Sequence, residues 1–107
     1  MTMDIRYGGN PADVMTATTD RLRADYMVEG AFAPGRMRLT YTHFDRMIVG
    51  GACPTDQGLV IDDGAELGTA LFFSDREGGI ANLGGSGTIT VDGVRHRIGN
   101  RDVLYIG

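Results

Sequence analysis

The dipeptide Asp92-Gly93, set between two runs in which apolar and polar residues alternate, constrains the fold of this chain more than any other feature. Aspartate followed by glycine tolerates positive φ at both central residues of a type I′ turn, so the pair predicts a two-residue β-hairpin. Residues that pair across such a hairpin lie on the same face of it, so Val91, Val94, Ile89 and His96 are expected on the inner face. The predicted register pairs Val91 with Val94, Thr90 with Arg95, Ile89 with His96 and Thr88 with Arg97.

The rest of the chain after residue 36 also favours strands. Met37, Leu39 and Tyr41 alternate with polar residues, as in a half-buried strand. Seventeen glycines in 107 residues indicate many tight turns, which is typical of an all-β design. Further strands or short apolar runs are expected at residues 47–49, 59–61, 70–73, 79–83 and 103–106.

Two short helices are predicted before these strands. Asn10-Pro11 offers an N-cap followed by proline at the first helical position, and Asp13 favours the helix dipole. A second helix start is Thr18 or Thr19, ahead of a run that reaches Tyr26. Residues 1–107 are therefore interpreted as one partial domain, with a helical N-terminal arm over residues 1–35 and β-strands over residues 36–107.

The final predicted strand, Val103–Ile106, runs to the end of the sequence without a polar tail. Because an uncovered apolar strand edge favours pairing with other chains, proteins normally avoid one. The natural protein is therefore expected to continue beyond Gly107, and the open strand is expected to pair with another chain.

Charge and hydropathy exclude several classes of partner. The formal net charge is −4 and the ten basic residues, all arginine, are scattered, which argues against nucleic acid binding. No apolar run approaches the roughly 20 residues of a membrane-spanning helix, and no signal peptide is recognisable at the N-terminus. Cys53, the single cysteine, has no partner for an internal disulfide. A cytoplasmic location is expected.

Three motifs carry a resemblance to a known family. Residues 41–51 read Tyr-Thr-His-Phe-Asp-Arg-Met-Ile-Val-Gly-Gly, residues 82–87 read Asn-Leu-Gly-Gly-Ser-Gly, and residues 99–107 read Gly-Asn-Arg-Asp-Val-Leu-Tyr-Ile-Gly. Residues 80–93 and 99–106, which overlap the second and third motifs, look like the middle of a cupin jelly roll. Taken together, the three motifs resemble the N-terminal half of the 5-keto-4-deoxyuronate isomerase (4-deoxy-L-threo-5-hexosulose-uronate ketol-isomerase) family.

The resemblance implies a mainly β, incomplete cupin-type (RmlC-like) jelly roll from a longer bicupin protein. It implies an isomerase, an intramolecular oxidoreductase of pectin and uronate breakdown, that converts 5-keto-4-deoxyuronate to 3-deoxy-D-glycero-2,5-hexodiulosonate. Members are commonly hexameric, and three histidines and one glutamate of their C-terminal cupin hold zinc. No position of this chain matches those ligands, so no metal-binding or cofactor-binding residue is expected here.

The candidate catalytic residues are His43, Asp45 and Arg46. His43 continues the Met37, Leu39 and Tyr41 face, so it would point into the barrel as a base or substrate contact; a structural histidine is the more common use. Arg46 could bind a uronate carboxylate in bidentate fashion. The commoner alternative is an ion pair with Asp45, Asp75 or Glu77.

Other residues that could suggest a functional site have simpler structural interpretations. His96 is interpreted as structural, and Cys53 as a small buried residue without a paired base. Asp62-Asp63 before glycine is typical of a turn. Gly84–Gly87 opens a strand and not a helix, so it is not a phosphate-binding loop.

The sequence supports two hypotheses. In the first, the chain is the N-terminal, metal-free part of the isomerase, shaping fold and oligomer without activity of its own. In the second, it is a non-catalytic cupin-like module for sugar binding or assembly. A downstream His-x-His and Glu cluster would separate them in favour of the first.

Overall fold

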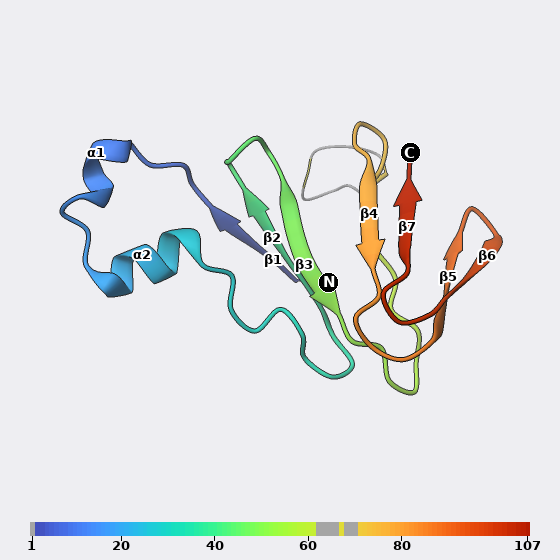
Figure 1. Cartoon of the computed structure of the whole chain (residues 1–107). Helices are drawn as coiled ribbons and strands as arrows, with labels where there is room; N and C mark the ends of the chain where they lie inside the picture. The colour runs from blue at the N-terminus through green and yellow to red at the C-terminus, as the bar shows by residue number, and fades with distance from the viewer. Residues whose placement is uncertain (1, 62–66, 68–70) are drawn as a thin grey trace. The chain divides into compact units, whose positions relative to one another are not determined.

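The computed structural model describes residues 2–61, 67 and 71–107. It is mainly β, with two short helices, and the chain divides into two compact units, residues 1–62 and 63–107 (Figure 1). The predicted fold class, an incomplete β fold of jelly-roll type with short N-terminal helices, is confirmed.

The first unit is built on a three-stranded sheet in the order β1-β2-β3. Strand β1 (Thr2–Arg6) runs parallel to β2 (Met37–Thr42), and β2 is antiparallel to β3 (Ile48–Ala52). Parallel neighbours need a long crossover connection, which here contains both helices. The strand at residues 2–6 lies where the sequence predicted a helical arm, and β3 continues through the Gly-Gly pair that was expected to end it.

Both helices begin as the sequence predicted. The Asn10 side chain accepts a 2.9 Å hydrogen bond from the Ala12 amide ahead of α1 (Pro11–Val14). Thr18 caps α2 (Thr19–Tyr26) by accepting a 3.2 Å hydrogen bond from the Arg21 amide. These caps satisfy amide donors that have no partner within a helix.

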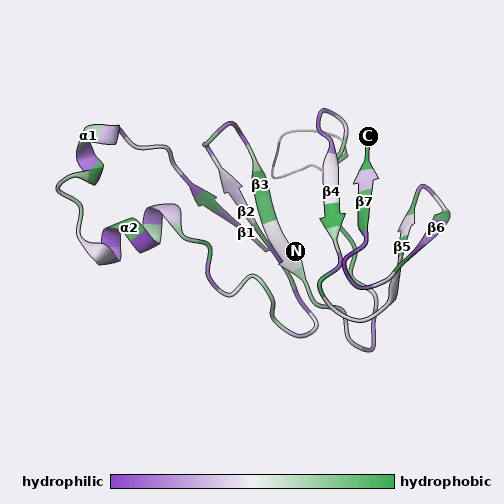
Figure 2. Cartoon of the chain, in the orientation of Figure 1, coloured by the Kyte–Doolittle hydropathy of each residue, from purple (hydrophilic) through white to green (hydrophobic). Residues whose placement is uncertain are grey.

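The two faces of the first sheet differ in chemistry. One carries the apolar residues of the alternating pattern, and hydrophobic colouring follows parts of β1 and β3 (Figure 2). The other carries Arg38 and Thr40, with Gly51 and Val49 as their partners on β3. A Cβ atom on Gly51 would lie 2.5 Å from the Ala31 carbonyl oxygen, so the segment around Ala31 packs over this second face. This packing explains why Thr40 is 5% exposed.

The second unit contains two antiparallel pairs. Strand β4 (Gly78–Ala81) pairs with β7 (Val103–Ile106), and β5 (Gly87–Val91) pairs with β6 (Val94–Ile98). The β5–β6 register is the one predicted, and φ is 49° at Asp92 and 78° at Gly93. The predicted alternation of exposed and buried side chains along β5 and β6 also holds, except that Val94, beside the turn, is 57% exposed.

Asn82 joins the strands of the second unit. Its side-chain amide donates to the carbonyls of Gly85 (2.9 Å) and Ile98 (3.2 Å). The Asn82 backbone amide donates to the Asp102 carbonyl at 2.9 Å, and the Asn82 backbone carbonyl accepts from the Arg101 amide at 2.6 Å. The Asn-Leu-Gly-Gly-Ser-Gly motif is therefore a structural corner, a turn whose Asn82 hydrogen bonds connect the β4–β7 pair to the β5–β6 pair.

Two further expectations concern the middle of the chain. Residues 59–61 and the described part of 70–73 form turns or irregular backbone, not strands, although Phe72 is 8% exposed. The Asp62-Asp63 turn falls outside the described residues. Within the described ranges, no helix is long and apolar enough to cross a membrane.

Candidate functional site

The loop between β2 and β3 carries the three residues that the sequence singled out. The Thr42 hydroxyl lies 2.8 Å from the Met47 carbonyl and 3.2 Å from the Phe44 carbonyl, and the Met47 amide donates to the Phe44 carbonyl at 3.3 Å. Between these anchors, φ is 56° at Asp45 and 55° at Arg46. Two consecutive non-glycine residues in the left-handed region are sterically costly, so the loop holds a strained turn.

His43 begins this loop and lies among aromatic rings. Its ring stacks on Tyr7, with centroids 4.8 Å apart and planes at 9°, and meets Tyr41 edge-on at 4.9 Å. The His43 amide donates to the Arg6 carbonyl at 2.9 Å, which extends the β1–β2 pairing by one step. The imidazole is therefore positioned by both parallel strands.

A second ring pair lies beside the same loop. The rings of Tyr26 and Phe44 are 5.5 Å apart and tilted by 41°. This contact ties the end of α2 to the loop. Tyr7 is 70% exposed and Phe44 39%, so the aromatic loop cluster, defined as Tyr7, Tyr26, Tyr41, His43 and Phe44, presents ring surface to solvent.

The structure changes the interpretation of His43. The sequence pattern placed it on the inner face of a barrel, but β2 ends at Thr42 and His43 is exposed. Asp45 and Arg46 are exposed as well, and within the described ranges neither forms an ion pair. The bidentate carboxylate contact that the sequence suggested for Arg46 remains a prediction.

The secondary candidates lie elsewhere. His96 is half-buried on β6 opposite Ile89, as the hairpin register requires. Cys53 is half-buried and its thiol is free. Its backbone amide donates to the Arg36 carbonyl, and its backbone carbonyl accepts from the Gly35 amide. Gly84 and Gly85 form part of the corner around Asn82 and precede a strand.

The described residues do not fit the zinc centre that the family resemblance implies for the complete protein. Among them, no group of three or more His, Cys, Asp or Glu side chains lies close enough to hold a metal ion. His43 has aromatic neighbours, and His96 belongs to the other unit. No chemical step through zinc is therefore derived from these residues.

The structure also reveals arginines that the sequence did not single out. The Arg6 side chain has a buried Nε without a hydrogen-bond partner, beside a cavity that it lines with Asp20 and Arg23. Arg23 itself pairs with Glu29 at 2.9 Å. Nothing in the spacing of these residues pointed to a shared cavity, because they meet through the β1–β2 crossover.

No protein family model matches the chain. Curated proteins called 4-deoxy-L-threo-5-hexosulose-uronate ketol-isomerase, in contrast, match nearly the whole chain. The protein from Halalkalibacterium halodurans is 46% identical over 105 residues, 98% of this chain and 38% of the relative. The one from Shouchella clausii is 42% identical over the same shares. Isomerase 1 of Rhizobium meliloti is 44% identical over 107 residues, all of this chain and 38% of the relative.

The similarity extends through both units of the chain, but the chain spans about two fifths of the length of these relatives. Identity above 40% over 105 or more residues covers far more of the chain than the three motifs that carried the resemblance. The resemblance to the 4-deoxy-L-threo-5-hexosulose-uronate ketol-isomerase family, predicted from three sequence motifs, is thereby confirmed over nearly the whole chain.

Proposed function

We propose that this chain is the N-terminal part of a uronate ketol-isomerase of the cupin superfamily. The single observation that carries the proposal is the 42–46% identity to relatives of that name in Halalkalibacterium halodurans, Shouchella clausii and Rhizobium meliloti, over at least 98% of the chain. The complete protein would convert 5-keto-4-deoxyuronate to 3-deoxy-D-glycero-2,5-hexodiulosonate in pectin and uronate breakdown. It would act as a zinc-containing cytoplasmic hexamer.

Within that enzyme, the role proposed for residues 1–107 is structural. Aldose–ketose isomerisation needs a base for the α-proton and a group that polarises the carbonyl, for which zinc is suited. The described residues bring no metal-ligand group together, and His43 has rings instead of a carboxylate beside it. The zinc ligands and the chemistry are therefore assigned to the remaining three fifths of the complete protein.

The test is a measurement on the 107-residue chain incubated with zinc. We expect no isomerase turnover and no stoichiometric zinc after gel filtration, while the Halalkalibacterium halodurans relative, assayed in parallel, shows both. Turnover by the chain at the rate of that relative would refute the structural role. One tightly bound zinc per chain would refute the assignment of the ligands to residues outside this chain.

A second candidate, a non-catalytic sugar-binding or assembly module, is favoured by the aromatic loop cluster. Tyr7 is 70% exposed, and exposed rings are common at binding surfaces. The two functions differ in the sequence expected beyond residue 107 in the natural protein. A downstream His-x-His and Glu cluster supports the isomerase, whereas binding of neutral sugars without such a cluster supports the module.

A further inference from the structure

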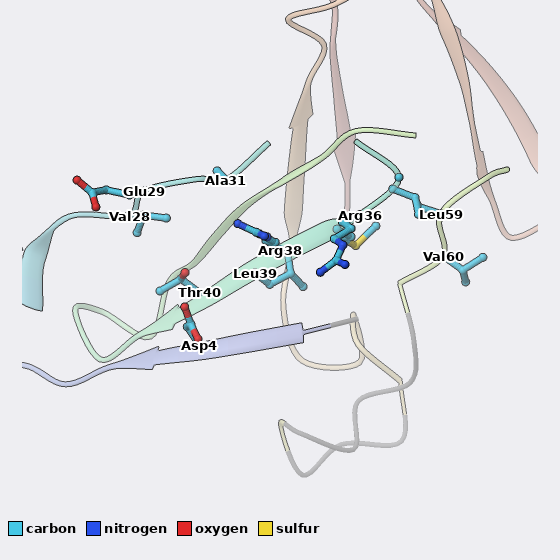
Figure 3. A pocket seen from close by; sticks show the side chains of 12 residues that line it. Asp4, Val28, Glu29, Ala31, Arg36, Arg38, Leu39, Thr40, Leu59 and Val60 are labelled. Carbon is cyan, nitrogen blue, oxygen red and sulfur yellow. The ribbon is translucent and has the colours of Figure 1, made fainter. Parts of the chain in front are cut away.

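A cavity of about 550 Å³ lies beside β2 within the first unit. Side chains from β2, from residues 28–31 and from residues 59–60 surround it (Figure 3). Its size falls within the range of pockets that hold small molecules. It is separate from the aromatic loop cluster, none of whose residues lines it.

Two arginines give this cavity its charge. Arg36 and Arg38 stand two positions apart at the start of β2. Arg38 extends toward residues 28–31 and donates from Nη1 to the Gly30 carbonyl at 3.0 Å, which fixes its guanidinium and leaves four other N–H donors (Figure 3). The exposed Arg36 side chain has no hydrogen bond or ion pair with any residue that the structure describes.

The acidic residues of the cavity do not neutralise this pair directly. Glu29 is bonded to Arg23 at 2.9 Å, on the side of the neighbouring cavity. Asp4 is the register partner of Thr40 across the β1–β2 ladder and forms no ion pair within the described ranges. A guanidinium pair that is partly fixed and not matched by a carboxylate is suited to a carboxylate ligand.

Thr40 adds a hydroxyl group to the wall of the cavity. The residue is 5% exposed, lines the cavity and makes no side-chain hydrogen bond to the part of the chain that the structure describes. Its hydroxyl is therefore free to bond to a ligand or to water in the cavity. The Asp4 carboxylate, on the same face, adds an acceptor for hydroxyl donors.

We propose that the cavity beside β2 binds a monosaccharide acid, with its carboxylate on Arg36 and Arg38 and its hydroxyls on Thr40 and Asp4. The apolar side chains of Val28 and Leu59 line the same space and can contact the C–H face of a sugar ring. Neither the family resemblance nor the aromatic loop cluster assigns ligand binding to these residues. The choice of a sugar acid over another hydroxy acid rests partly on the proposed function.

The experiment is a titration of the isotope-labelled 107-residue chain with D-galacturonate, followed by NMR of backbone amides. We expect saturable shifts around Arg38 and Thr40, and none with D-galactose, which lacks the carboxylate. Arg36→Gln should weaken binding about tenfold, the effect of one charge-assisted hydrogen bond. Thr40→Val keeps the side-chain shape and should weaken binding several-fold.

Arg97→Gln is the matched control, because Arg97 is exposed on β6 in the other unit. It should leave the affinity unchanged, and circular dichroism should show that all variants fold. Absence of saturable shifts, equal binding of D-galactose, or unchanged affinity in Arg36→Gln would each overturn the proposal. Because the titration measures binding without turnover, its failure would leave the isomerase proposal standing, and an inactive complete enzyme would leave the titration result unaffected.

Discussion

Tyr7 and His43 stack ring on ring, with centroids 4.8 Å apart and planes at 9°, and so link the end of β1 to the loop that follows β2. The segment between the two residues contains both helices. The contact lies next to the 2.9 Å hydrogen bond from the His43 amide to Arg6. The ring pair and the backbone bond together close the parallel part of the first sheet.

Replacing His43 by alanine should destabilise the chain by about 1 kcal/mol, because aromatic pairs contribute roughly that much beyond burial. His43→Phe keeps both ring contacts and should retain most of the stability. Urea unfolding of the three proteins measures the difference. Equal midpoints for the alanine and phenylalanine variants would show that the stacking contributes nothing.

The turn at Asp45 and Arg46 should become more stable with glycine at its second position. Arg46 has φ of 55°, which costs a side-chain-bearing residue about 1 kcal/mol and costs glycine little. Arg46→Gly is therefore expected to raise the free energy of unfolding by about 1 kcal/mol. Arg97→Gly, in the extended strand β6, is the control and should lower it. A destabilised Arg46→Gly protein would mean that the Arg46 side chain makes a favourable contact.

Gly51 should not tolerate a side chain. A Cβ atom there would lie 2.5 Å from the Ala31 carbonyl oxygen and 2.9 Å from the Phe32 ring. Gly51→Ala should cost about 1–3 kcal/mol, the range of overpacking in a filled site. The same change at Gly58, where nothing lies within 4 Å, should be nearly neutral. Thermal unfolding compares the two, and equal melting temperatures would argue against close packing of residues 31–32 on β3.

Tyr105 should lose its proton at higher pH than an ordinary tyrosine. A hydrogen bond with Glu77 and, to a lesser degree, desolvation and the Glu77 charge raise the pKa of its phenol. Because the pKa of Tyr105 is higher in the folded chain than in the unfolded chain, its contribution to stability is present at pH values below the unfolded-state pKa. That contribution is lost as the pH rises through the folded-state pKa. Glu77→Ala should move the Tyr105 pKa back toward its usual value. NMR of tyrosine ring carbons follows this titration, and an unchanged pKa in the variant would rule out Glu77 as the cause.

The parts of the fold with local signals were predictable from the sequence. The β5–β6 register follows from Asp92-Gly93 and the flanking alternation, and the helix starts follow from Asn10 and Thr18, because each signal lies within a few residues of its effect. Strand β1 had no such signal. It is defined by parallel pairing with β2, which lies far along the chain beyond both helices.

The site was predictable only in part, for the same reason. The motif at residues 41–51 drew attention to His43, but its exposure depends on where β2 ends. Burial of Thr40 depends on residues near Ala31 crossing that face of the sheet. The alternating pattern marked Arg38 and Thr40 as outward-facing, and it could not predict that a covering segment would create a cavity there.

The most direct test of the central claim is an exchange in the Halalkalibacterium halodurans relative. Its 105 matching residues would be replaced by those of this chain, and isomerase turnover and zinc content would be measured on the purified hybrid. We predict an active, zinc-containing hybrid, with a relative lacking the segment as the inactive control. A hybrid that fails to assemble, or that assembles with zinc but does not turn over, would contradict the claim that this chain is an interchangeable part of such an isomerase.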